Sequence, residues 1–151
     1  MPETALPSTP TPLPPASIAE FQRRCDVIEE SYEFMLAYAA QGLTGAEGSP
    51  SGGQLREQLT RAADALSALG DLLTTIIDSE PLEPAQAFQA YQAVLDRDAR
   101  NALAAAQLVL AQPTISSQLV DNLNASIHLR ALLTDLFLID EILKGRGEGV
   151  R

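Results

Sequence analysis

Five polar residues of this chain lie on or beside the apolar stripes of its predicted helices, at positions from which they could do chemistry. They are Tyr32, Tyr91, Asp98, Arg130 and Asp140. Phenols, carboxylates and a guanidinium that converge inside a helical bundle can form a polar pocket, which could bind a small ligand or transfer a proton. The same side chains could instead serve the fold, by pairing across helices and fixing their register.

Asp98 and Arg130 favour the structural alternative. They are equally distant in sequence from Thr114, which lies in the turn between the last two predicted helices. In an antiparallel hairpin the two side chains would lie at the same height, so we expect an ion pair between them. Asp140 lies near the C-terminus of the last helix, where a carboxylate opposes the helix dipole, so it needs a partner, a ligand or exposure.

No catalytic, metal, haem or nucleotide motif is recognised, and we expect no cofactor. Di-metal carboxylate bundles use two Glu-x-x-His pairs, whereas this chain has a single histidine, His128, and no such pair. The single cysteine, Cys25, lies on an apolar seam, so we expect a buried structural thiol rather than a nucleophile.

Helices with a regular apolar periodicity must position these residues. In two stretches, residues 18–39 and 55–76, apolar side chains recur at alternating steps of three and four. This spacing places one line of side chains on one helix face, as in a bundle. We predict no strand, and helices over residues 17–41, 54–79, 84–111 and 116–144. Short connections force antiparallel neighbours, so the predicted fold class is an all-α, up-down-up-down four-helix bundle.

This bundle is predicted to be a single domain over residues 16–145. Residues 1–15 hold most of the ten prolines, which is too dense for a helix, so we expect a disordered Pro-rich tail there. Residues 146–151 are predicted to form a flexible C-terminal tail. Ser17 and Glu20 fit a capping box at the start of the first helix. Gly70 interrupts the second helix, and the close approach of a neighbouring helix would offset its cost.

The charge of the chain excludes some classes of partner. The 151 residues carry a formal net charge of −10, with a pI near 4.4, whereas nucleic acids and anionic membranes require a positive surface. No segment approaches the ~20 apolar residues of a membrane span. The N-terminus lacks the basic start and apolar stretch of a signal peptide, and one cysteine allows no disulfide within the chain. We therefore expect a cytoplasmic protein.

The last predicted helix is apolar on several sides, so it is either kinked or packed against a second molecule. Leu138 and Ile142 lie far around it from Leu133 and Leu136, and we expect a homodimer through these two residues.

Two functions follow from these patterns. The preferred one is a non-enzymatic interaction or scaffold protein, adaptor-like, that binds a protein partner. The alternative is a ligand-binding or enzymatic bundle that uses the five polar residues. A closed core of leucine and alanine would favour the first function, and a cavity with convergent polar groups would favour the second.

Overall fold

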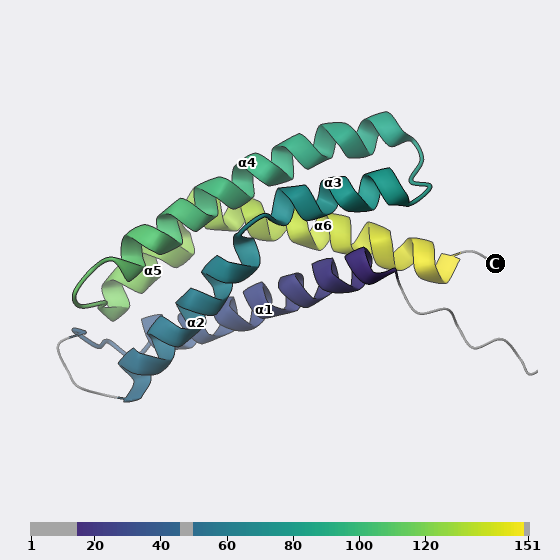
Figure 1. Cartoon of the computed structure of the whole chain (residues 1–151). Helices are drawn as coiled ribbons and strands as arrows, with labels where there is room; N and C mark the ends of the chain where they lie inside the picture. Colours follow the sequence, from purple (N-terminus) through teal and green to yellow (C-terminus); the bar gives the residue numbers. More distant parts are fainter. Residues whose placement is uncertain (1–14, 46–49, 150–151) are drawn as a thin grey trace, which may run out of the picture.

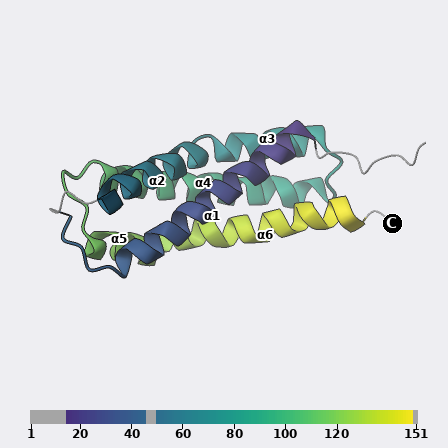
Figure 2. The same cartoon turned by 90° about the horizontal axis from the view of Figure 1, so that it is seen from below.

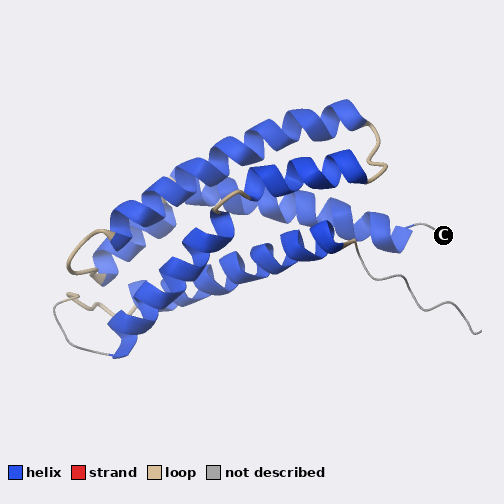
Figure 3. Cartoon of the chain, viewed as in Figure 1, coloured by secondary structure: helices blue, strands red, loops and turns tan. Residues whose placement is uncertain are grey.

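The computed structural model describes residues 15–45 and 50–149, and this part of the chain contains helices and no strand (Figure 3). The all-α class is therefore confirmed. The predicted Pro-rich tail lies outside the described residues except for Pro15, as do residues 150–151. The helices are α1 (Ala16–Ala39), α2 (Pro50–Leu66), α3 (Leu69–Ser79), α4 (Ala85–Leu110), α5 (Ser117–Ala125) and α6 (Ile127–Gly149).

Two of the predicted long helices are each divided in two. The helix expected over residues 54–79 is α2 followed by α3, and the helix expected over residues 116–144 is α5 followed by α6. The last helix also continues past Lys144 to Gly149. The predicted single helices were wrong at these breaks, because Arg24 of α1 bonds to the carbonyl groups at the first break and Ser126 adopts an extended backbone at the second.

The helices run along the molecule, with α3 following α2 end to end and α6 following α5 in the same way (Figures 1 and 2). The α1 helix packs against α2, α5 and α6, while α4 packs against α3, α2 and α6. The start of α1, the end of α6 and the connection between α3 and α4 lie at one end of the molecule, and the connection between α4 and α5 lies at the other (Figures 1 and 2).

The predicted apolar seams form the core. Most of their residues belong to one continuous buried cluster, to which α4, α5 and α6 add further aliphatic side chains. Because fully burying one such aliphatic side chain contributes about 1.5–3 kcal/mol, this cluster is the main source of stability. From the first two predicted helices it takes Phe21, Cys25, Ile28, Met35, Leu55, Leu59, Leu66, Leu69, Leu73 and Ile76.

Arg24 holds the break between α2 and α3. Its guanidinium donates to the carbonyl oxygen of Ser67 at 2.6 Å and to those of Asp64 and Ala65 at 3.3 Å. Asp64 and Ala65 lie in the last turn of α2, where carbonyl groups lack intrahelical partners, and Ser67 directly follows the helix. Ala68 then turns the chain with a left-handed backbone, at a φ of 60°.

Glu20 orients Arg24 instead of capping α1. Its carboxylate accepts from Nε of Arg24 at 2.8 Å and from Arg23 at 2.8 Å, and these bonds, Arg23 first, lower the Glu20 pKa to about 2. The predicted capping box with Ser17 was wrong, because α1 begins at Ala16 with Pro15 as its N-cap and no side-chain cap.

Side chains from α1 and α2 fix the connection between α4 and α5. Arg56 donates to the carbonyl oxygens of Leu110, Gln112 and Pro113 at 2.7–3.1 Å. The Tyr38 hydroxyl donates to the Ile115 carbonyl at 2.7 Å. The connection between α4 and α5 is thereby bonded to both α1 and α2.

The break between α5 and α6 occurs at Ser126, whose extended backbone separates the two helices and whose hydroxyl accepts from the His128 amide at 3.2 Å. Of the two explanations given for the apolar pattern of the last helix, a kink is therefore present. It lets Leu123 and Leu132 both face the core although a straight helix would point them apart.

Gly70 allows α4 to approach the start of α3. A Cβ atom at this position would overlap the side chain of Asp96, and Gln92 Nε2 donates to the Gly70 carbonyl at 3.0 Å. The close approach expected at this glycine is confirmed.

Gly70→Ala is expected to lower the free energy of unfolding by about 1–3 kcal/mol, the usual cost of overpacking. Gly53→Ala in α2 is the matched control, because a Cβ there meets nothing within 4 Å, and it should raise stability by roughly 0.5–1 kcal/mol. Urea denaturation measures both changes. Similar effects at the two positions would show that α4 is not closely packed on Gly70.

Candidate functional site

Tyr91 and Asp98 meet a third polar residue, Asp135, between α4 and α6. The Tyr91 hydroxyl donates to Oδ1 of Asp135 at 2.8 Å, and the Asp98 carboxyl lies close enough to Asp135 to perturb its ionisation. Tyr91 and Asp98 are two helical turns apart, so they lie on one face of α4. The sequence pointed to these two residues and missed Asp135, the residue on which both converge.

Asp135 is a buried carboxyl with an incomplete set of hydrogen bonds. It is only 6% exposed, and its Oδ2 atom has no hydrogen-bond partner. Burial raises its pKa to about 7, the Asp98 carboxyl adds to this rise, and the hydrogen bond from Tyr91 opposes it. Burial and the bond to Asp135 also raise the Tyr91 pKa.

Two adjacent carboxyls in a poorly solvated place do not ionise independently, because their like charges repel. Asp135 therefore keeps its proton up to near-neutral pH, because burial and the neighbouring Asp98 carboxyl both raise its pKa. Chemically this arrangement can store and release a proton, or accept a positively charged group in the proton's place.

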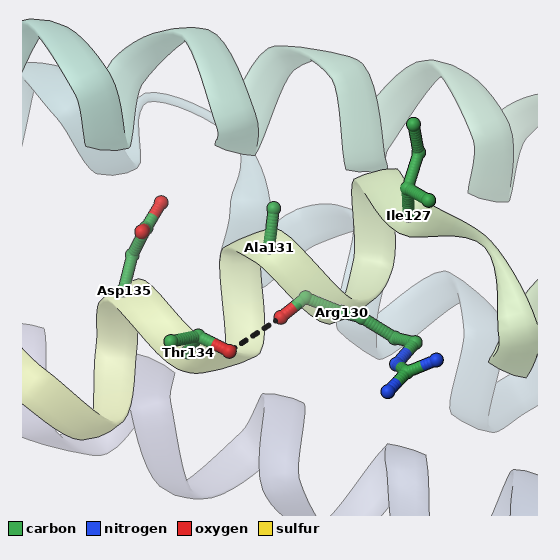
Figure 4. Close-up of a pocket in the computed structure, with 5 residues that line it drawn as sticks. All are labelled: Ile127, Arg130, Ala131, Thr134 and Asp135. Carbon is green, nitrogen blue, oxygen red and sulfur yellow. Dashed lines mark hydrogen bonds between the residues drawn. The ribbon is translucent and has the colours of Figure 1, made fainter.

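A hollow of about 460 Å³ lies beside Asp135 and is lined by residues of α6. In Figure 4, Asp135 points toward the neighbouring α4, whereas the Arg130 guanidinium points away from it. Thr134 donates its hydroxyl to the Arg130 carbonyl at 2.9 Å. The hollow is a surface concavity with one buried carboxyl at its edge, and its lining residues are Ile127, Arg130, Ala131, Thr134 and Asp135.

The predicted ion pair between Asp98 and Arg130 was wrong. Arg130 is exposed, and no ion pair among the described residues joins it to Asp98. Arg130 and Asp135 are five residues apart, which places them roughly 140° apart around an ideal helix. The predicted position along the helix axis was nearly right, but the α6 side chain that lies beside Asp98 is that of Asp135.

Asp140 and Tyr32 lie apart from this cluster. Asp140 is buried, and its Oδ2 atom pairs with Nζ of Lys144 at 2.9 Å, while Oδ1 has no hydrogen-bond partner. It lies near α1, where burial first, and then Asp140, raises the pKa of the Cys25 thiol. That thiol is buried, as expected. Tyr32 is partly buried against the core, so the five predicted polar residues do not form one pocket.

The outer face of α6 exposes large apolar side chains. Phe137 is 55% exposed, Leu138 51% and Ile142 40%. Leu138 and Ile142 were the residues expected at a partner surface, and Phe137 was missed although helical periodicity places it opposite the buried Ile139. Ile127, 75% exposed at the start of α6, extends the same face.

Other kinds of site find less support in the part of the chain that the structure describes. It contains no group of three or more His, Cys, Asp or Glu side chains placed to hold a metal ion. None of its helices is both long and apolar enough to cross a bilayer.

Asp135→Asn tests the protonation of the buried pair. An amide keeps an acceptor for Tyr91 and offers a donor toward Asp98, as the protonated carboxyl does. A carboxyl whose pKa is raised on folding makes the wild type less stable as the pH rises from about 4 to about 7. We therefore expect the variant to be more stable by about 1–3 kcal/mol at pH 8, with the difference vanishing near pH 4.

Urea denaturation across this pH range measures the difference, and Asp121→Asn, at an exposed carboxylate of α5, is the control. A constant difference from pH 4 to pH 8 would show that the native Asp135 carboxyl carries no proton.

Comparison with protein-family models, with curated proteins and with solved structures gives no match. The function of the chain must therefore be argued from the exposed face of α6 and from the buried carboxyl pair.

Proposed function

We propose that this chain is a non-enzymatic interaction protein that associates with a second copy of itself through the outer face of α6. The observation that carries this proposal is the cluster of Phe137, Leu138 and Ile142, three large apolar side chains exposed within two turns of one helix. Leu138 and Ile142 are one helical turn apart and Phe137 directly precedes Leu138, and exposed apolar patches are typical of interaction sites.

The interior supports the same proposal. The buried residues form one cluster of leucine, isoleucine, alanine and aromatic side chains, which is the closed core expected of an interaction protein. The two buried carboxyls are Asp135, which faces α4, and Asp140, which lies near α1. They do not line a common cavity.

In this proposal the six helices form four rod-like units. These units follow the up-down-up-down order expected from the sequence. The α2 and α3 helices form one bent rod, and α5 and α6 form another. We also propose a cytoplasmic location. The single cysteine is a buried free thiol, and thiols stay reduced in the cytoplasm. An adaptor-like role, in which the dimer binds a further protein, is the wider form of the proposal.

A ligand-binding bundle is the second candidate, and the Asp98–Asp135 pair favours it. An unpartnered carboxyl oxygen beside a hollow is suited to a small cation such as a primary amine. Methylamine should then raise the melting temperature of the wild type and leave that of Asp135→Asn unchanged, with sodium chloride at equal ionic strength as the control.

Leu138→Glu is expected to abolish self-association, because it places a charge in the centre of the proposed contact. Leu108→Glu is the matched control, since Leu108 is an equally large side chain on α4 and is 67% exposed. Light scattering coupled to size-exclusion chromatography should give about twice the 16.1 kDa chain mass for the wild type and for the control. A wild type that remains at the chain mass up to high micromolar concentration contradicts the proposal.

A further inference from the structure

We propose that two copies pair through α6 in an antiparallel arrangement, in which Arg130 of each copy bonds to Glu141 of the other. This inference rests on the self-association proposed above and adds its geometry. It comes from the order of charged and apolar side chains along the exposed face of the helix.

Arg130, Thr134, Phe137 and Glu141 form one stripe on α6. They step by four, three and four residues, so they lie within about 60° of one another around the helix. All four are exposed, whereas Leu132, Leu136 and Ile139 on the opposite side are fully or almost fully buried. The stripe is therefore the part of α6 that a partner helix would meet.

The charges at the two ends of this stripe are opposite. Among the described residues, no ion pair includes Arg130 or Glu141, although Asp140 and Lys144 of the same helix do pair. Uncompensated charges of opposite sign at the two ends of one exposed stripe are complementary to a second, reversed copy of the same stripe.

A two-fold axis midway between Arg130 and Glu141 satisfies both charges at once. In a two-fold contact, a bond from one residue to a second implies the reciprocal bond, so two Arg130–Glu141 pairs form, one at each end. The same axis brings Phe137 and Leu138 of both copies to the centre. The result is an apolar centre with charged ends, which is the usual anatomy of a protein interface.

Charge exchange tests the pairing. Arg130→Glu and Glu141→Arg each place like charges together twice per dimer, so each should raise the dissociation constant about 10-fold. The double variant restores opposite charges and should return to within about threefold of the wild type. Sedimentation equilibrium at low salt measures these constants, and Asp121→Arg, on α5, is the control.

Disulfide formation tests the antiparallel register independently. In this arrangement the two copies of residue 134 lie on either side of the axis, about 5 Å apart along the helix direction, whereas the two copies of residue 127 are about 25 Å apart in that direction. Thr134→Cys should therefore oxidise to a covalent dimer, and Ile127→Cys should not. The natural Cys25 is buried and should not contribute.

The outcomes separate this inference from the proposal beneath it. A wild type that is monomeric at every concentration overturns both. A wild-type dimer that the single charge variants do not weaken, or that the double variant does not restore, overturns the pairing alone. A covalent dimer of Ile127→Cys overturns the antiparallel register and indicates a parallel contact.

Discussion

The capping of α2 by Arg24 is the interaction on which the packing of the molecule depends. A single straight helix over the predicted 54–79 range could not follow both α1 and α4, because neighbouring helices cross at an angle. The chain instead ends α2 beside three carbonyl groups that accept from one guanidinium, and it restarts as α3, which packs mainly against α4. Glu20 holds the guanidinium in place. One helix thereby determines where another one bends, and Gly70 allows the restarted helix to touch its neighbour.

The α6 helix combines two surfaces with different chemistry. Toward α4 it presents Asp135, a carboxyl that is nearly excluded from water. Toward solvent it presents Phe137 and Leu138, which are apolar and exposed. Each placement is unfavourable in an isolated chain, since a carboxyl group is stabilised by water and apolar surface is not. Natural proteins depart from these preferences mainly at functional or strained sites, which is why both proposals made for this chain use α6.

The sequence predicted the fold class and the core well, because long apolar seams have a period that only a helix satisfies. It could not predict where the long helices break. The break at Ala68 depends on Arg24, some forty residues away, and residue spacing within one helix carries no sign of such a partner. The Ser126 break had an indirect signal, the change in direction of the apolar face, which the sequence left open between a kink and a partner.

The polar cluster was half predicted for a related reason. Tyr91 and Asp98 stand on one apolar seam and were recognised there, whereas Asp135 lies at the edge of its seam. Counting residues from the turn predicted how far along α4 and α6 the contact lies. It could not predict which face of α6 makes the contact, because the break at Ser126 changes the rotation of α6 about its axis. Arg130 was therefore expected where Asp135 lies. Phe137 was missed because the exposed side of the helix had been assigned to its neighbour Leu138 and to Ile142.

The hydrogen bonds that join the end of α1 to the start of α5 bear on the order of folding. Ser117 donates its hydroxyl to the Tyr38 carbonyl at 2.6 Å, and it exchanges backbone and side-chain bonds with Leu43 at 2.8 Å. These partners are separated by 74 to 79 positions in the chain, so no local hairpin can form the bonds. The first half of the molecule can acquire helices early, but it cannot close until the second half is synthesised and folded against it. The rate of folding should then reflect this long-range closure rather than the rapid growth of its helices.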